Sequence, residues 1–268
     1  MNKNKKLIFA KNTRKNILQL SYQAKSSHIG SCFSIIEILT ILYNDIFKNY
    51  SKKNIKKYKN QFILSKGHAC LALYCVLYEK KIINKKTLQS YGSNNSLLMS
   101  HVSHHVPGVD FSTGSLGHGL PVATGIALSL KSRKINKKTF VLISDGELNE
   151  GTTWESILFA CHHKLNNLII IIDYNKLQSL TFVKNTLNIE PLNKKFSSFG
   201  CKVFNINGHN YKQIKKALSF NSASKPIVII ANTIKGRGVS FMENNIEWHY
   251  KSPNLNQLKT AIKEINNA

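Results

Sequence analysis

Two stretches decide how this sequence is expected to fold: FVLISDGELNEG at residues 140–151 and LIIIIDYNKLQ at residues 168–178. Each begins as a short, unbroken apolar run and then turns polar. An unbroken run, in contrast to an alternating one, is typical of a strand in a sheet that is covered on both faces. Because a segment of helix length separates the two runs, we predict a strand–helix–strand unit with parallel strands.

The same pattern extends over most of the chain. Apolar runs predict strands at Phe62 to Leu64, Phe140 to Ile143, Leu168 to Ile172, Lys202 to Ile206 and Ile227 to Ala231. Helices are predicted between and after them, at Pro121 to Leu130, Glu155 to His163, Tyr211 to Phe220 and Leu255 to Ile265. This alternation predicts an α/β fold, a doubly wound and mainly parallel sheet with helices on both faces. No repeat or linker divides the chain, so residues 1–268 are expected to form one domain.

The region before the first strand is expected to be a helical N-terminal segment. One amphipathic helix is predicted to begin at Ile17, Leu18, Leu20 and Tyr22. A second has a broader apolar face, made of Ile35, Ile36, Ile38, Leu39, Leu42 and Ile46. Further along, Thr152 to Glu155 has the pattern of a capping box, which would introduce the helix at Glu155.

Composition excludes several classes of protein. With 42% hydrophobic and 19% charged residues, the chain has the composition of a globular protein and not of a disordered one. Its longest aliphatic run, Leu168 to Ile172, is far shorter than the ~20 residues that span a bilayer. The apolar stretch Leu7 to Ala10 is too short for a signal peptide, so we expect a cytoplasmic protein without membrane contact. The five cysteines form no CxxC pair, which favours reduced, structural thiols.

The formal charge of +25 makes nucleic-acid binding an alternative to consider. The basic residues are scattered along the chain, however, and aromatic side chains are not interleaved with them as single-strand binding requires. We therefore expect no nucleic-acid partner. A non-catalytic, basic binding protein remains the alternative from a different class, and it predicts salt-sensitive affinity for DNA or RNA.

Polar residues follow the two central strands at the point where each strand ends. Asp145 comes directly after the first apolar run, and Asn175 comes shortly after the second. In sheets of this type, ligands bind beyond the carboxyl ends of the strands. A carboxylate, an amide oxygen and a nearby carbonyl form the hard oxygen ligand set that Mg²⁺ prefers. Gly146 would let a phosphate approach the backbone closely.

The sequence Asp145-Gly146-Glu147, followed by Asn175, resembles the thiamine diphosphate motif. The resemblance runs from about Ile17 to Pro253, nearly the whole chain. Five flanking segments carry it in the same order as in transketolase: Ser27 to Gly30, Leu64 to His68, Pro107 to Asp110, Ser112 to Gly117 and Thr233 to Val239. The resemblance implies the thiamine diphosphate-binding fold and the two cofactors thiamine diphosphate and Mg²⁺. It implies metal ligands at Asp145, Asn175 and the Leu177 carbonyl, diphosphate contacts at His68, Gly146 and His249, and a loop against the aminopyrimidine at Gly114, Ser115 and Leu116.

The resemblance also implies which residues act on the substrate. Four histidines would line the channel above the thiazolium, bind sugar hydroxyls and carry protons: His28, His68, His101 and His249. Glu150 matches a glutamate near the subunit interface that is linked to cofactor activation. The remaining histidines lack such matches and are expected to be surface or core residues: His104, His105, His118, His162, His163 and His209.

The reaction that the resemblance implies is transfer of a two-carbon ketol unit from a ketose phosphate to an aldose phosphate. Nothing in the sequence resembles the family's second, pyrimidine-binding domain. We therefore expect a separately encoded partner, the C-terminal transketolase subunit, in a two-plus-two heterotetramer, with sugar phosphates as substrates. This chain alone is expected to be inactive.

Several positions depart from the family's pattern. Ser144 and Tyr250 stand where glycine is usual, Ile29 and Val102 stand where proline is common, and Ser179 to Asn185 lacks the usual glycine. Another thiamine enzyme remains the nearest rival, either deoxyxylulose phosphate synthase or the alpha subunit of a 2-oxo acid dehydrogenase. The segments Glu147 to Gly151 and Lys66 to His68 favour transketolase over both.

Overall fold

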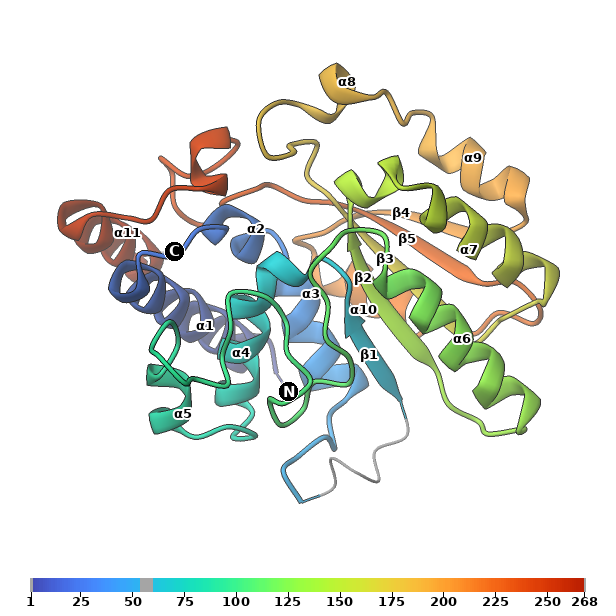
Figure 1. Ribbon diagram of the computed structural model, residues 1–268, viewed down its shortest axis with the longest axis horizontal. Coiled ribbons are helices and arrows are strands. Elements are labelled where there is room, and N and C mark those ends of the chain that lie inside the picture. The colour runs from blue at the N-terminus through green and yellow to red at the C-terminus, as the bar shows by residue number, and fades with distance from the viewer. Residues whose placement is uncertain (1, 54–59, 268) are drawn as a thin grey trace.

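Five strands form a single parallel sheet in the computed structural model of the protein, which describes residues 2–53 and 60–267 (Figure 1). Their order across the sheet is β1-β2-β3-β5-β4, and every neighbouring pair is parallel. The strands are β1 Gln61–Leu64, β2 Thr139–Ser144, β3 Leu168–Tyr174, β4 Lys202–Asn207 and β5 Ile227–Asn232. All five predicted strands are confirmed, each with one or two further residues.

Burial follows from each strand's place in the sheet. Every residue of β2 and β3 is buried, as the unbroken apolar runs predict for strands covered on both faces. Alternate residues of β3 point to opposite faces, so Ile169 and Ile171 join one hydrophobic cluster while Ile170 and Ile172 join the other. β4 lies at the edge of the sheet and is only partly buried.

Helices cover both faces of the sheet, as predicted (Figure 1). Residues of α1, α3, α4, α10 and α11 belong to one hydrophobic cluster, and residues of α6, α7 and α9 belong to the other. The bounds are α1 Lys3–Ala24, α2 Ile29–Phe33, α3 Ile36–Ile41, α4 Cys70–Glu79, α5 Lys85–Gln89, α6 Gly119–Ser132, α7 Gly151–His162, α8 Val183–Thr186, α9 Leu192–Phe199, α10 Tyr211–Leu218 and α11 Leu255–Asn267. Short 3₁₀ helices occur at Gly67–Ala69, Asp145–Asn149 and Ile246–His249.

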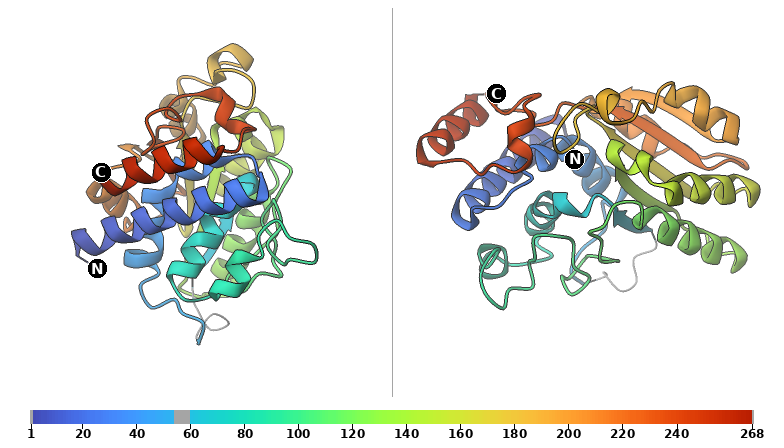
Figure 2. Two further views of the ribbon diagram at one scale, coloured as in Figure 1. Left: turned by 90° about the vertical axis from the view of Figure 1, so that its left-hand side faces the viewer. Right: turned by 45° about the horizontal axis from the view of Figure 1, so that its top comes forward.

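The N-terminal segment is helical, but its first helix begins earlier than predicted. The side chain of Asn2 accepts a hydrogen bond from the Lys5 amide and caps α1, so Ile17 to Tyr22 lie in the last turns of this helix and do not start it. The second predicted apolar face is divided between α3 and a π-helical turn, Leu42–Ile46. Helices α1 and α11 pack side by side, which brings the two ends of the chain onto one flank (Figure 2).

The predicted capping box at Thr152 to Glu155 is wrong. Helix α7 begins at Gly151, so Thr152 and Glu155 lie inside its first turns. The Thr152 hydroxyl instead donates to the carbonyl of Gly117, at 2.9 Å. A capping box does occur, but earlier in the chain, where Ser144 and Glu147 enclose the start of the 3₁₀ helix after β2.

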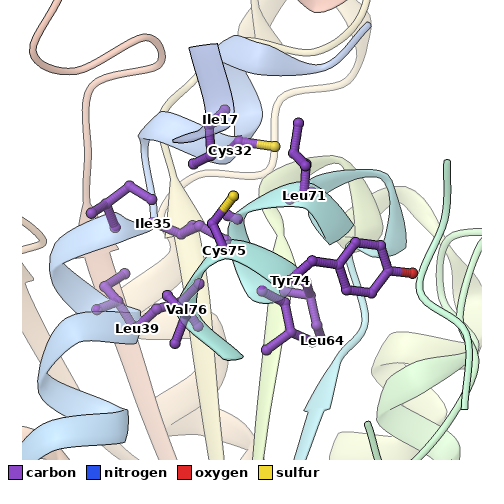
Figure 3. Close-up of a cluster of buried hydrophobic side chains, with 14 of the residues drawn as sticks. Ile17, Cys32, Ile35, Leu39, Leu64, Leu71, Tyr74, Cys75 and Val76 are labelled. Carbon is purple, nitrogen blue, oxygen red and sulfur yellow. The ribbon is translucent and has the colours of Figure 1, made fainter. Parts of the chain in front are cut away.

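Four of the five cysteines are buried, as expected for small core residues, and Cys161 is partly exposed. All five thiols are free. Figure 3 shows Cys32 and Cys75 among Ile17, Ile35 and Val76, where α1, α2, α3 and α4 meet. Burial raises the pKa of the Cys32 thiol to about 11, which keeps it protonated and unreactive. In the described part of the chain, none of the helices combines the length and apolar character that crossing a bilayer requires.

Candidate functional site

The carboxyl ends of β2 and β3 bring the two polar stretches of the sequence together. Ser144 pairs with Asp173 in the sheet, so Asp145 and Asn175 follow at adjacent strand ends. The Lys176 amide donates to Oδ2 of Asp145 at 2.7 Å and ties the two stretches to each other. Both side chains are buried from bulk solvent, and both line the same cavity of about 480 Å³.

Hydrogen bonds determine which end of the Asn175 amide is available. Its Nδ2 donates to Oδ2 of Asp173 at 3.0 Å, and its Oδ1 accepts from the Leu177 amide at 3.1 Å. The amide oxygen is therefore turned away from Asp173. A second lone pair on that oxygen is free to meet a cation.

Asp173 is the buried anchor of this arrangement. Lys66 contacts it at 2.5 Å, Ser34 donates to it at 2.7 Å, and the hydroxyl of Thr233 donates to its other oxygen. Burial alone would raise the pKa of Asp173, but the charge of Lys66 and these hydrogen bonds outweigh it and hold the pKa below its ordinary value. Asp173 is therefore an ionised, fully engaged carboxylate.

Asp145 has the opposite character. Burial, together with the neighbouring Asp173 carboxylate, raises the pKa of Asp145 to about 7. The backbone amide of Lys176 is the one hydrogen-bond donor that its side chain has among the described residues. A carboxylate with this environment would be stabilised by a bound cation.

The carbonyl predicted as the third metal ligand already faces a positive charge. Lys235 Nζ donates to the carbonyl oxygens of Leu177, at 3.2 Å, and Gln178, at 2.9 Å, and lies 2.8 Å from Nδ1 of His249. Burial and the nearby Lys66 lower the pKa of Lys235 to about 8. A carbonyl oxygen has two lone pairs, so the Leu177 carbonyl keeps one beside the bond from Lys235. By chemical type, the carboxylate, amide and carbonyl oxygens here are the ligands that a hard divalent cation prefers.

Across residues 2–53 and 60–267, no group of three or more His, Cys, Asp or Glu side chains is arranged to hold a metal ion.

Four histidines from distant parts of the chain surround the same cavity. The ring of His28 lies 5.2 Å from that of His68, 6.1 Å from that of His101 and 5.0 Å from that of His249, measured between centroids. Burial and His101 lower the pKa of His28 to about 4, and burial and Lys235 lower the pKa of His249 to about 3. Burial and Lys66 hold the pKa of His68 well below its usual range. These three imidazoles are neutral near pH 7.

The remaining predicted residues are placed as follows. Gly114, Leu116 and Gly146 line the cavity, and Glu150 lies at its rim with an exposed side chain. Ser115 does not line it and is exposed. The six other histidines lie outside the cavity. His209 has a structural role, since it bonds Glu37 at 2.9 Å and accepts from the Ile234 amide at 2.8 Å.

The departures from the expected sequence pattern are accommodated without backbone strain. Ser144 has φ −89° and Tyr250 has φ −110°, so neither position needs glycine. Tyr250 lies at the cavity rim, with its ring 4.8 Å from that of His249. The segment after Leu177 turns back on itself, and Leu177 pairs with Phe182 in an antiparallel bridge.

Four buried charged residues at the site were not predicted from the sequence: Lys66, Glu147, Asp173 and Lys235. All four lie at or within three residues of the carboxyl end of a strand, in the same segments as the predicted site residues. The sequence feature that could have identified them is a charged residue among glycine, serine and apolar neighbours.

A larger open groove of about 1020 Å³ lies beyond the ends of β3, β5 and β4. Asn175 and Leu177 reach its edge, but Asp145 and the four clustered histidines do not line it. The convergent chemistry therefore lies in the smaller cavity.

Comparison with known proteins agrees with this geometry. Residues 8–263 match the family described as transketolase, thiamine diphosphate binding domain. The chain is 42% identical over 259 residues to an apulose-4-phosphate transketolase subunit of Actinobacillus succinogenes, covering 96% of this chain and 94% of that one. It is 34% identical over 241 residues to a 6-deoxy-6-sulfo-D-fructose transketolase subunit of Clostridium sp., covering 89% of this chain and 88% of that one.

Among solved structures, transketolase of Campylobacter jejuni superposes with a TM-score of 0.91 at 28% identity. The match covers 99% of this chain but only 43% of the C. jejuni chain. The fold, the site and these relatives lead to one conclusion: the chain belongs to the transketolase family and corresponds to its N-terminal, thiamine diphosphate-binding part.

Proposed function

We propose that this chain binds thiamine diphosphate through Mg²⁺ and forms one half of a ketol-transferring enzyme. The observation that carries the proposal is the meeting of Asp145 and Asn175 at adjacent strand ends, in a cavity bordered by four histidines. Asp145, Asn175 and the Leu177 carbonyl would hold the metal ion. His68, Gly146 and His249 would contact the diphosphate, and the loop at Gly114, Ser115 and Leu116 would lie against the aminopyrimidine.

When bound, the cofactor supplies the nucleophilic carbon and the electron sink for breaking and forming the carbon–carbon bond. The protein's contribution is to position the cofactor and substrate, neutralise phosphate charge and move protons. Lys235 lines the cavity beside the proposed diphosphate position, and its positive charge would favour a polyanionic ligand, whereas the charge of Lys66 is already balanced by Asp173.

The histidines are suited to hydroxyl recognition and proton transfer. Nδ1 of the neutral His249 faces the Lys235 ammonium and accepts its hydrogen bond, so the ring proton is on Nε2. His249 can therefore donate from Nε2, while His28 and His101 offer further ring nitrogens to substrate hydroxyls. A neutral imidazole can accept a proton as well as donate one, as general acid–base steps require.

We propose a ketose phosphate as donor and an aldose phosphate as acceptor, with a separate C-terminal subunit in a two-plus-two assembly in the cytoplasm. The A. succinogenes relative is named as one subunit of its enzyme, which supports a divided enzyme here. The two subunit relatives are named for a phosphorylated and a sulfonated sugar, which supports an anionic ketose as substrate. Glu150, which is exposed at the cavity rim, would lie near the subunit interface and act in cofactor activation.

Reconstitution tests this function. The chain is mixed with the product of a candidate C-terminal subunit gene, thiamine diphosphate and Mg²⁺, and ketol transfer is followed with a panel of ketose and aldose phosphates. Transfer by the mixture and none by either chain alone is expected. Activity of this chain alone at enzymatic rates would refute the divided enzyme, and turnover of pyruvate without ketose phosphates would favour the rival thiamine enzymes. Salt-sensitive RNA or DNA binding without cofactor binding would favour the basic binding protein.

A further inference from the structure

One buried carboxylate at the site belongs neither to the proposed metal ligands nor to the proposed cofactor contacts. Glu147 has a relative solvent exposure of 0% and is the third residue of the 3₁₀ helix that follows β2. Its side chain lies behind the cavity wall and does not line the cavity. A fully buried carboxylate needs a structural reason, because removing its hydration is costly.

The hydrogen bonds of Glu147 join three separate segments. Its Oε1 accepts from the hydroxyl of Ser65 and from the Gly117 amide at 3.1 Å, while its Oε2 accepts from the Ser144 amide at 2.8 Å. Ser65 belongs to the segment that carries His68, Gly117 to the segment that carries Gly114 and Leu116, and Ser144 immediately precedes Asp145. The Glu147 side chain thus connects three of the segments that supply the proposed diphosphate, aminopyrimidine and metal contacts. The remaining proposed contacts come from the segments after β3 and β5.

Because its partners are donors, both carboxylate oxygens of Glu147 must act as hydrogen-bond acceptors. The Gly117 and Ser144 amides can only donate, and one faces each carboxylate oxygen. The Ser65 hydroxyl oxygen already accepts from the Gly119 amide at 3.1 Å, which leaves its proton to point at Glu147. An amide side chain of the same shape would place an NH₂ group against a backbone N–H.

We infer that Glu147 is a positioning residue, which holds the three segments in register so that the cofactor-binding groups on them converge. The inference rests on the proposed function for its cofactor, but the hydrogen-bonding arrangement itself is independent of it. Glu147 also contacts the next helix, because its backbone carbonyl accepts a hydrogen bond from the hydroxyl of Thr153, at 2.7 Å, in the first turn of α7. The same residue therefore links the cavity wall to the helix that follows Glu150.

The test compares Glu147→Gln with Glu155→Gln, a matched change at an exposed glutamate on α7. Hydrogen exchange of the unloaded full chain is measured first. Glu147→Gln is expected to speed exchange roughly tenfold in residues 65–69, 112–119 and 144–150, while Glu155→Gln leaves them unchanged. Unchanged exchange in all three segments would overturn the inference, whether or not the chain binds thiamine diphosphate.

Cofactor affinity is measured next, by calorimetry with thiamine diphosphate and Mg²⁺. Glu147→Gln is expected to bind roughly 10- to 100-fold more weakly, as is usual when a residue that orients ligands is lost. In the reconstituted enzyme, the KM for thiamine diphosphate should rise while kcat at saturating cofactor stays within about threefold. Equal affinity of the variant and wild type would overturn the inference. A wild-type chain that binds no cofactor, alone or reconstituted, would instead refute the proposed function.

Ser65→Ala keeps the test decisive if Glu147→Gln does not fold. This change removes one donor to Glu147 and leaves the carboxylate in place. It is expected to weaken cofactor binding several-fold and to speed exchange in residues 112–119, since Gly117 and Gly119 share this network. Wild-type values for both measurements would contradict the role assigned to Glu147.

Discussion

Removing the Lys66 charge is the sharpest test of how the site is built. The side chains of Lys66 and Asp173 are 1% and 0% exposed and lie 2.5 Å apart. In Lys66→Met, the carboxylate would keep three neutral donors, from Ser34, Thr233 and Asn175, but would lose its counter-charge. Breaking one partner out of a buried pair of this kind costs about 3–5 kcal/mol, a large share of the ~5–15 kcal/mol that stabilises a typical protein.

The sign of the pH dependence follows from the same pair. The pKa of Asp173 is depressed in the folded protein, so its ionised form contributes stability that is present above the unfolded pKa and is lost as the pH falls through the folded pKa. Without Lys66, burial should raise the pKa of Asp173 instead. The variant is then expected to be most destabilised near neutral pH and relatively less so in acid.

Urea unfolding at pH 5 and pH 7.5, followed by tryptophan fluorescence, measures both effects. The control is Lys194→Met, at an exposed lysine on α9, which should change the free energy of unfolding by less than about 0.5 kcal/mol. The double variant Lys66→Met, Asp173→Asn should recover part of the loss, because no uncompensated charge remains. A cost below about 1 kcal/mol at pH 7.5 for Lys66→Met would refute this account of the buried pair.

Three further outcomes follow from particular contacts. The pKa of Asp145 is raised to about 7 in the folded chain, so its ionisation lowers stability as the pH rises from about 4 to about 7. Metal-free Asp145→Asn should therefore unfold at a higher urea concentration than the wild type at pH 8. The same variant should show no Mg²⁺-dependent heat of binding with thiamine diphosphate. His101→Ala should lower kcat/KM for the ketose in the reconstituted enzyme by roughly 10²-fold while cofactor affinity, measured by calorimetry, stays within about threefold. A Cβ on Gly67 would lie 2.4 Å from the Thr113 carbonyl oxygen, whereas one on Gly125 would meet nothing within 4 Å. In thermal unfolding, Gly67→Ala should therefore lower the free energy of unfolding by about 1–3 kcal/mol, and Gly125→Ala should raise it by about 0.5–1 kcal/mol. Equal melting temperatures for the two glycine variants would contradict the packing described.

The capping-box prediction at Thr152 to Glu155 failed because the same local pattern also occurs elsewhere in the chain. The pattern of a capping box occurs both at Ser144 to Glu147 and at Thr152 to Glu155, and nothing within either stretch decides between them. In the folded chain the first forms and the second does not, because Thr152 bonds the Gly117 carbonyl and Glu155 faces outward. Helix starts depend on such partners, which a local pattern does not contain.

The sequence by itself determined the five strands, their parallel arrangement and the pairing of Asp145 with Asn175 at one edge, because unbroken apolar runs and the polar residues after them are local properties. It also placed the chain in its family through short segments that follow one another in a characteristic order. Only the tertiary structure decided that Lys66, Glu147, Asp173 and Lys235 are buried at the site. Lys66 and Asp173 are 107 positions apart, and a charged side chain is buried only when folding supplies its partner.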